Sequence, residues 1–290
     1  MRSAQASLTA KAVATMRVIA SKTSAAAVRL DDHASMGLLS PPLRGIVRTS
    51  VLLAGLSEPL FRACLYLAGH LVDHVALRTR LIDRLVEDAV AQGAGQLVLL
   101  GAGLDARAYR IRALEAVDVF EIDHPATQQY KRARTQHVMP VSRSLTHVAV
   151  DFERDSLAQK MAACGFQSNV MSCFVCEGVY PYLSHASVER SLRDIATLAT
   201  DKSRLVVTYL PRSARFQPHI RMAAPVVLRL LGEPFGEDWL PEEFATAAQA
   251  AGFSVLNDYA APHWLAALGV APRGTLYEYE RLAVLERNQL

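Results

Sequence analysis

The segment Leu99-Leu-Gly-Ala-Gly-Leu-Asp-Ala-Arg107 joins a mostly apolar stretch to a turn with two glycines. Residues 96–100 predict a short buried strand, and Gly101 and Gly103 follow it directly. Glycine permits a tight turn and lets a backbone approach a ligand that a Cβ atom would exclude. We therefore predict a strand, a glycine turn and the start of a helix, with a ligand in the crevice at the carboxyl end of the strand.

Apolar strands alternate with helix-like segments on the carboxyl side of this turn. The sequence predicts strands at 117–123, 147–152, 171–176 and 204–210, separated by helices at 125–136, 156–164 and 187–200. Nearly all-apolar strands that alternate with helices are typical of a parallel sheet covered on both faces. The predicted fold class is therefore α/β, with a Rossmann-like, mostly parallel sheet.

Two regions extend this predicted sheet. Residues 1–92 are expected to form an N-terminal helical cap that ends in an amphipathic helix at 74–91. The α/β domain then occupies 93–290. Within it, residues 211–240 interrupt the alternation and are expected to form a lid insertion with a helix at 220–231. Because this insertion follows a strand at its carboxyl end, we expect it to cover a bound substrate.

The carboxyl-terminal part completes the sheet. A helix at 241–251 precedes a strand at 253–260, and a last strand at 276–285 follows after a short connection. Such a short connection suggests an antiparallel strand added at the sheet edge. The sequence thus predicts seven strands, with the last one antiparallel.

Composition and charge narrow the class of protein. The chain has 290 residues, of which 51% are hydrophobic and 20% charged, and this balance favours a folded core over disorder. A net charge of +3 from scattered basic residues does not indicate a nucleic-acid partner. No run of about 20 uncharged apolar residues predicts a membrane span. We expect a cytoplasmic monomer or homodimer, although the basic first 30 residues fit either a targeting segment or a helical arm of the fold.

Cys173 and Cys176 form a C-x-x-C pattern inside the strand predicted at 171–176. Residues three apart on a strand point to opposite faces, which prevents joint metal ligation or an easy disulfide. We therefore predict buried structural cysteines and no metal site.

One carboxylate extends the ligand prediction. Asp123 lies 22 residues after Gly101, at the end of the second predicted strand, where it can accept hydrogen bonds from both ribose hydroxyls of a nucleoside cofactor. Together with Ala106, the glycines also satisfy the G-x-G-x-x-A pattern of NAD-dependent dehydrogenases. At this point a dehydrogenase and a methyltransferase both remain open.

Three features favour a methyltransferase that uses S-adenosylmethionine. Asp151 and Phe152 end the third strand, where an acid can accept the adenine amino group and an aromatic ring can line the base. Glu177 and Gly178 end the fourth strand, beside the expected position of the transferable methyl group. A dehydrogenase would need a proton donor, and the chain has no Tyr-x-x-x-Lys pair.

Several segments carry a resemblance to a known family. They are Arg78-Thr-Arg-Leu-Ile-Asp83, Leu100-Gly-Ala-Gly-Leu-Asp-Ala-Arg-Ala-Tyr-Arg110, Phe120-Glu-Ile-Asp-His-Pro125 and Glu177-Gly-Val-Tyr-Pro-Tyr-Leu183. With these segments the chain resembles the leucine carboxyl methyltransferase family, which includes bacterial polyketide O-methyltransferases, over roughly residues 9–288. The resemblance implies a class I methyltransferase sheet and S-adenosylmethionine as the cofactor.

The resemblance also implies roles for single residues. Gly101, with Gly103, would contact the cofactor, Asp123 would bind its ribose, and Asp151 and Phe152 would hold its adenine. Arg78 would pair with the methionyl carboxylate, Arg17 would be a second basic group there, and Glu177 would lie near the amino acid end. Three departures from the family pattern occur: Ala106 replaces a threonine, Pro181 replaces a residue such as methionine, and Asp32-His-Ala34 replaces Asp-Pro-x-Ala. The last two put the acceptor in doubt rather than the cofactor.

The sequence says least about the molecule that accepts the methyl group. An ionised carboxylate needs no base for methylation, whereas a phenol would gain from one. The candidates for a catalytic side chain are Tyr182, Tyr209 and His124, with His185 and His263 as further histidines. Arg107 and Arg110 are expected on a solvated helix face, with Arg107 close enough to orient Asp105. The sequence therefore predicts O-methylation of a carboxyl or hydroxyl group of a small-molecule, polyketide-like acceptor; methylation of a protein's C-terminal carboxylate and a dehydrogenase are the alternatives.

Overall fold

The computed structural model describes residues 7–23, 28–67, 70–150, 155–214, 222, 236–270 and 279–288. The predicted adenine residues Asp151 and Phe152 lie outside this part of the chain, as does the helix predicted at 220–231, apart from residue 222. Every structural statement below concerns the described residues.

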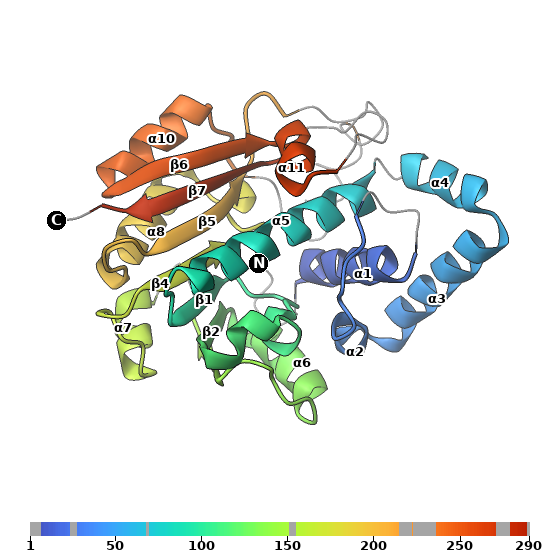
Figure 1. Cartoon of the computed structure of the whole chain (residues 1–290), viewed down its shortest axis with the longest axis horizontal. Helices are drawn as coiled ribbons and strands as arrows, with labels where there is room; N and C mark the ends of the chain where they lie inside the picture. Colours follow the sequence, from blue (N-terminus) through green and yellow to red (C-terminus); the bar gives the residue numbers. More distant parts are fainter. Residues whose placement is uncertain are drawn as a thin grey trace.

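Seven strands form one sheet in the order β3-β2-β1-β4-β5-β7-β6. Their bounds, in that order, are Ser144–Ala149, Asp118–Asp123, Gln96–Leu100, Ser172–Cys176, Arg204–Tyr209, Arg281–Arg287 and Phe253–Ala260. The neighbours from β3 to β5 pair in parallel, and β7 runs antiparallel to both β5 and β6. The mostly parallel, seven-stranded sheet with an antiparallel last strand is therefore confirmed (Figure 1).

The last strand lies inside the sheet and not at its edge. β7 carries a continuous apolar run at 282–285 that is buried, whereas β6 has exposed residues along its middle. A strand that is apolar on both faces is stable only between two neighbours under helices, while an edge strand tolerates polar positions. The chain therefore places β7 centrally and leaves β6 and β3 at the edges.

Helices cover both faces of the sheet. Successive side chains of β1 alternate between two cores, with Leu97 and Leu99 in one and Val98 and Leu100 in the other. The helices that supply the first core include α1 (Leu8–Lys22), α5 (Leu71–Ala91) and α11 (Ala261–Leu268). The second core is supplied by α7 (Leu157–Ala163), α8 (His185–Leu198) and α10 (Pro241–Ala250). In Figure 1, α5 runs across the sheet with α1 beside it.

The amino-terminal part is helical, as predicted. Besides α1 and α5 it contains α2 (Ser35–Leu38), α3 (Pro41–Leu56) and α4 (Glu58–Leu67), and Figure 1 shows α3 and α4 extending away from the sheet. Residues of α1 and α5 belong to the same core as residues of β1, β2 and β4. The division into a cap at 1–92 and a domain at 93–290 stays a prediction. No single helix in the described part is long and apolar enough to cross a membrane.

One predicted helix, one strand boundary and one helix that was not predicted differ between the sequence analysis and the structure. The helix expected after the glycine turn is replaced by two 3-10 turns, η1 (Arg107–Tyr109) and η2 (Arg112–Ala116), because η1 and the residues before it are buried on all sides. A helix on a sheet would keep one face in solvent. β3 begins three residues earlier than predicted, since an edge strand tolerates polar residues that break the apolar pattern. α11 was missed, although Pro262 and Gly269 stand at its two ends as start and stop signals.

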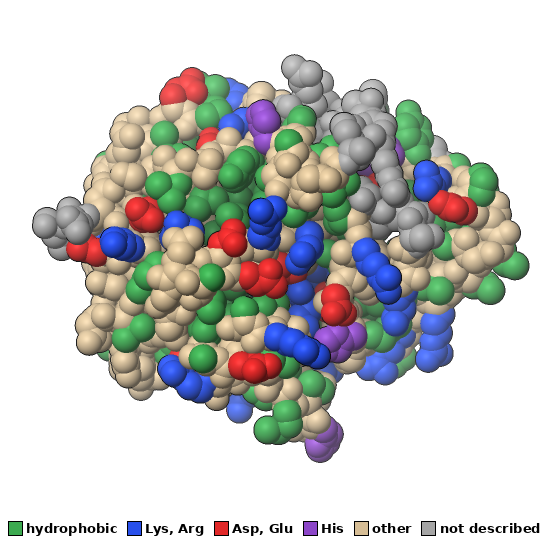
Figure 2. All heavy atoms as spheres, in the orientation of Figure 1, with side chains coloured by type: hydrophobic (Ala, Val, Ile, Leu, Met, Phe, Trp, Pro, Cys, Tyr) green, Lys and Arg blue, Asp and Glu red, His purple; other side chains and the backbone are tan. Residues whose placement is uncertain are grey.

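The last strand, predicted at 276–285, is Arg281–Arg287 in the structure, and residues 276–278 lie outside the described part. The other predicted elements in the described part are confirmed with small shifts. β1 and β6 have the predicted bounds, and α6 (Pro125–Thr135) is one residue shorter than predicted. Figure 2 shows acidic and basic side chains interspersed over the centre of the face that carries α5.

Candidate cofactor site

Two glycines fix the turn after β1. Gly101 and Gly103 have φ angles of 64° and 51°, in the left-handed region that favours glycine. A Cβ atom on Gly101 would lie 2.4 Å from Cγ2 of Val179, and one on Gly103 would lie 3.0 Å from Cβ of Ala10. The tight turn is as predicted, but the space that these glycines leave is used by protein side chains from α1 and from the segment after β4.

Asp123 lies against this turn at the end of β2. Its Oδ2 accepts a hydrogen bond from the Gly103 N–H at 2.5 Å, and its Oδ1 accepts one from the His124 N–H at 2.6 Å. Burial raises the pKa of this carboxyl group, and the two hydrogen bonds act in the opposite direction. The structure therefore brings the predicted ribose-binding carboxylate to the glycine turn, where it also orders the backbone.

Glu177 follows β4 and binds two arginines. Its Oε1 accepts a hydrogen bond from Nε of Arg78 at 2.9 Å, and its Oε2 accepts one from Nη1 of Arg107 at 2.8 Å. Burial alone would raise the pKa of Glu177, but the guanidinium groups of Arg107, Arg78 and Arg17 outweigh it and lower the pKa to about 2. Glu177 is thus an ionised carboxylate in a nearly dry site.

Arg78 projects from α5 into the same site. Besides Glu177 it binds Glu280, through Nη1 and Oε2 at 2.5 Å. Burial acts to lower the pKa of Arg78, yet the carboxylates of Glu280 and Glu177 raise it, so the guanidinium stays charged. Among the described residues no hydrogen bond reaches Nη2, which lies 4.0 Å from the position that a Cβ atom would take on Gly178. Arg78 therefore keeps two N–H groups for a ligand.

Arg17, the second predicted basic group, comes from α1. It is buried, its Nε lies 3.1 Å from Oδ2 of Asp32, and its Nη2 donates to the carbonyl of Leu104 at 2.5 Å. Its charge contributes to the low pKa of Glu177. Arg17 is therefore near enough to Glu177 to act on it electrostatically, but its hydrogen-bond partners in the described structure are other protein groups.

Arg107 and Arg110 are not on a solvated face, and that prediction was wrong. Arg107 is fully buried, because the 3-10 turn replaces a helix, and it binds Asp83, Asp105 and Glu177. The contact with Asp105 is as predicted. Arg110 donates to Asp83 at 2.7 Å. The sequence analysis did not predict the pairing of Arg110 with Asp83. Both residues nevertheless lie in segments that resemble the family, at 78–83 and 100–110.

We name these buried groups the charged cluster, consisting of Arg78, Arg107, Asp83, Asp105, Glu177 and Glu280. Nη2 of Arg107 is buried and has no hydrogen-bond partner among the described residues. A buried unpaired donor is costly, so it indicates a missing acceptor. Free N–H groups on Arg78 and Arg107 beside ionised carboxylates fit a ligand that carries both a carboxylate and an ammonium group, as the amino acid end of S-adenosylmethionine does.

Two of the three candidate histidines have structural partners. His124 caps α6 by accepting a hydrogen bond from the Ala126 N–H at 3.3 Å. His185 contacts the Asp238 carbonyl oxygen at 2.8 Å, and its ring lies 3.9 Å from the ring of Trp239. His263 is exposed on α11. The described structure shows none of the three aimed at the charged cluster.

The two candidate tyrosines differ. Tyr209 is fully buried, stacks on Phe244 at 4.3 Å, and donates its hydroxyl proton to Asp258 at 2.6 Å. Burial raises the pKa of Tyr209 strongly, so Tyr209 is a poor base, and its candidacy is withdrawn. Tyr182 is half-buried in the turn η3 (Tyr180–Tyr182), five residues after Glu177, and remains a candidate for the acceptor side.

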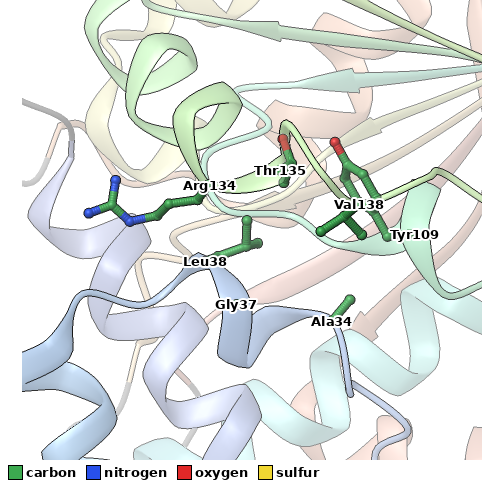
Figure 3. A pocket seen from close by; sticks show the side chains of 7 residues that line it. All are labelled: Ala34, Gly37, Leu38, Tyr109, Arg134, Thr135 and Val138. Carbon is green, nitrogen blue, oxygen red and sulfur yellow. The ribbon is translucent and has the colours of Figure 1, made fainter.

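Two pockets lie elsewhere, along α6. A cavity of about 10 Å³, no larger than a water molecule needs, is lined mainly by α2, α6 and η1 (Figure 3). In Figure 3, Tyr109 and Leu38 are among the side chains around it. An open groove of about 770 Å³ lies between α6 and β3. None of the predicted cofactor residues in the described part of the chain lines either pocket.

The cysteines of β4 behave as predicted. Cys173 belongs to one core and Cys176 to the other, and burial raises the pKa of the Cys173 thiol to about 12. Both cysteines are free. Across the described ranges no group of three or more possible ligands could hold a metal ion.

Comparison with known proteins identifies the family of this chain. A Mycobacterium avium protein named an S-adenosyl-L-methionine-dependent methyltransferase is 36% identical over 146 residues, which are 50% of this chain and 46% of that protein. A similarly named Streptomyces coelicolor protein is 34% identical over 139 residues, 46% of this chain and 47% of its own. The chain thus matches about half the length of these relatives.

A solved Bordetella parapertussis structure shares the fold alone, with 12% identity, a TM-score of 0.51, and coverage of 73% of this chain and 68% of that one. The model of the leucine carboxyl methyltransferase family matches residues 10–196, more than half of the chain, and takes in α5, the glycine turn, Asp123 and Glu177. This match to a methyltransferase family contradicts the dehydrogenase alternative. The chain therefore belongs to the leucine carboxyl methyltransferase family.

Proposed function

We propose that this chain is an S-adenosylmethionine-dependent O-methyltransferase whose acceptor is a small molecule with a carboxylate, of a polyketide-like kind. Family membership and the names of the relatives support methyl transfer. The choice of a carboxylate rests on one observation, namely that the predicted bases Tyr209, His124 and His185 are engaged with protein groups.

The cofactor is expected to lie over the glycine turn. Asp123 would accept the ribose hydroxyls, Arg78 and Arg17 would face the methionyl carboxylate, and Glu177 would face the ammonium group. Asp151 and Phe152 would hold the adenine. The free N–H groups of Arg78 and the low pKa of Glu177 support this direction of the cofactor.

When bound, the cofactor supplies a methyl group on a positively charged sulfur, which is already an activated leaving group. The chain's own contribution is alignment, which can supply a large part of the rate increase. A carboxylate acceptor has a reference pKa of about 4 and is ionised at neutral pH, so it can attack without losing a proton. A phenol, with a reference pKa of about 10, would need a base.

We also propose that the insertion at 211–240 covers the acceptor. Its two described ends meet, since Pro211 bridges to Trp239, and the Gly236 N–H donates to the carbonyl of Pro181 at 2.8 Å. A Cβ atom on Gly236 would lie 2.3 Å from the carbonyl oxygen of Leu183, so this end packs tightly on the segment that follows Glu177. This contact with the Tyr182 turn supports a role on the acceptor side.

The test is a transfer assay with S-adenosylmethionine labelled in its methyl group. Matched aromatic carboxylic acids and phenols are offered, and the product is treated with mild alkali. A methyl ester releases its label as methanol, whereas a methyl ether keeps it. The proposal predicts alkali-labile label in small molecules. Label only in ethers, or only in the protein fraction of an extract, would contradict it.

A further inference from the structure

Glu280 is a carboxylate of the charged cluster that no sequence motif indicated. It directly precedes β7 and is only 8% exposed. Its Oε2 accepts a hydrogen bond from Nη1 of Arg78 at 2.5 Å and lies 3.1 Å from Nε2 of His74. Both partners are on α5, about 200 residues earlier in the chain. Glu280 therefore ties the carboxyl-terminal strand to the helix that carries Arg78.

Arg78 is held at two of its three nitrogens. Glu177 binds Nε and Glu280 binds Nη1, so both edges of the planar guanidinium are fixed. Nη2 is left without a protein acceptor in the described structure, near Gly178. Two contacts on a rigid plane determine where the third nitrogen points. With Glu177 alone, the guanidinium could rotate about the Nε contact.

The surroundings hold Glu280 in place. The ring of His74 lies 5.0 Å from the ring of Trp264 and 5.1 Å from that of Tyr279. Burial lowers the pKa of His74, although Glu280 opposes this, so His74 gives Glu280 a hydrogen bond without a charge at neutral pH. A buried ion pair adds little net stability compared with apolar side chains of the same volume. Orientation of Arg78 is therefore the better account of this carboxylate.

We propose that Glu280 is a positioning residue for the cofactor, which directs Nη2 of Arg78 toward the carboxylate at the amino acid end of S-adenosylmethionine. This inference rests on the proposed function only for the position of that end. It concerns neither the acceptor nor the methyl transfer step.

The test is calorimetric titration of the full chain with two probes. S-adenosylhomocysteine has the amino acid end, and 5′-methylthioadenosine lacks it. Glu280→Gln keeps the shape and removes the charge, so it should weaken S-adenosylhomocysteine binding roughly tenfold, the effect of one weakened charge-assisted contact. Binding of 5′-methylthioadenosine should stay within about twofold. A merely structural role would weaken both ligands alike.

A matched control lies six residues further along the chain, within β7. Glu286 of β7 faces Arg204 at 3.6 Å, is partly exposed, and pairs far from Arg78. Glu286→Gln should change neither affinity. In an Arg78→Met background, Glu280→Gln should have no further effect on S-adenosylhomocysteine, because Glu280 acts through Arg78.

Three results would overturn the inference. They are wild-type binding of S-adenosylhomocysteine by folded Glu280→Gln, equal losses for both probes, and a full additional loss in the Arg78→Met background. If Glu280→Gln does not fold, Glu280→Asp serves instead; it keeps the charge but shortens the reach, and an unchanged S-adenosylhomocysteine affinity would count against the inference in the same way. Failure of the wild type to bind S-adenosylhomocysteine would instead contradict the proposed function.

Discussion

Two polar groups at the carboxyl edge of the sheet differ in how completely they are paired. In the charged cluster, Nη2 of Arg78 and Nη2 of Arg107 have no protein acceptor among the described residues. Beside β5, both carboxylate oxygens of Asp258 accept hydrogen bonds. One bond comes from the hydroxyl of Tyr209 at 2.6 Å and the other from Nε of Arg281 at 2.9 Å.

The difference separates a binding site from a structural contact. Tyr209, Asp258 and Arg281 are of residue types that occur in catalytic sites. Their polar side-chain atoms, however, form hydrogen bonds with one another.

In the charged cluster, Arg78 and Arg107 keep N–H groups without an acceptor among the described residues, while Glu177 and Glu280 are ionised. Elsewhere in the described part of the chain, buried donor atoms without a hydrogen-bond partner also occur on Lys131, Arg204 and Trp239. We infer that the ligand site is identified by unused arginine donors that lie beside the ionised carboxylates of Glu177 and Glu280.

The largest expected effect is on stability in acid. Glu177 and Glu280 have pKa values of about 2, below their ordinary value of 4.5, because arginines outweigh burial at both. A lowered pKa in the folded state means stability that is present above about pH 4.5 and lost as the pH falls toward 2. Each group should contribute on the order of 3 kcal/mol at neutral pH. Urea unfolding between pH 7 and pH 3 measures this, and a flat free energy of unfolding would count against the charged cluster as drawn.

Arg78→Met should weaken S-adenosylhomocysteine binding by about 3 kcal/mol, because it removes a buried charged donor from a carboxylate. The affinity for 5′-methylthioadenosine should change little. Titration calorimetry on a folded variant checks both, and unchanged S-adenosylhomocysteine binding would show that Nη2 is not part of the site.

Asp123→Ala, in contrast to Arg78→Met, should weaken the binding of both probes. Both carry the ribose, so both should lose about 2–3 kcal/mol, the value of hydrogen bonds to a charged acceptor. The glycine turn also loses the acceptor for the Gly103 N–H, so circular dichroism should accompany the titration. Near wild-type affinity for both probes would remove Asp123 from the site.

Tyr209→Phe should have the smallest effect. Loss of the hydrogen bond to Asp258 should cost about 1 kcal/mol of stability and leave methyl transfer unchanged. Thermal unfolding and the transfer assay measure the two quantities. A tenfold loss of activity with an intact fold would return Tyr209 to the list of candidate bases and break the comparison drawn above.

The sequence predicts most of the sheet, because apolar strands buried on both faces leave a clear pattern, as at Gln96–Leu100. It also locates the ends of β1, β2 and β4, where Gly101, Asp123 and Glu177 lie. It does not reveal Glu280 or the burial of Arg107. Both depend on contacts between distant segments, and a charged residue alone in sequence is typical of a solvated surface. The position of β7 was missed for the same reason, since pairing order is a tertiary property.

The claim that the charged cluster holds the amino acid end of the cofactor is tested most directly by titrating the wild-type chain with S-adenosylhomocysteine, 5′-methylthioadenosine and NAD. We predict micromolar-range binding of S-adenosylhomocysteine, at least tenfold weaker binding of 5′-methylthioadenosine, and no binding of NAD (order of magnitude, about 8 kcal/mol for a micromolar ligand). Equal affinities for the first two ligands, or tighter binding of NAD than of S-adenosylhomocysteine, would contradict the account.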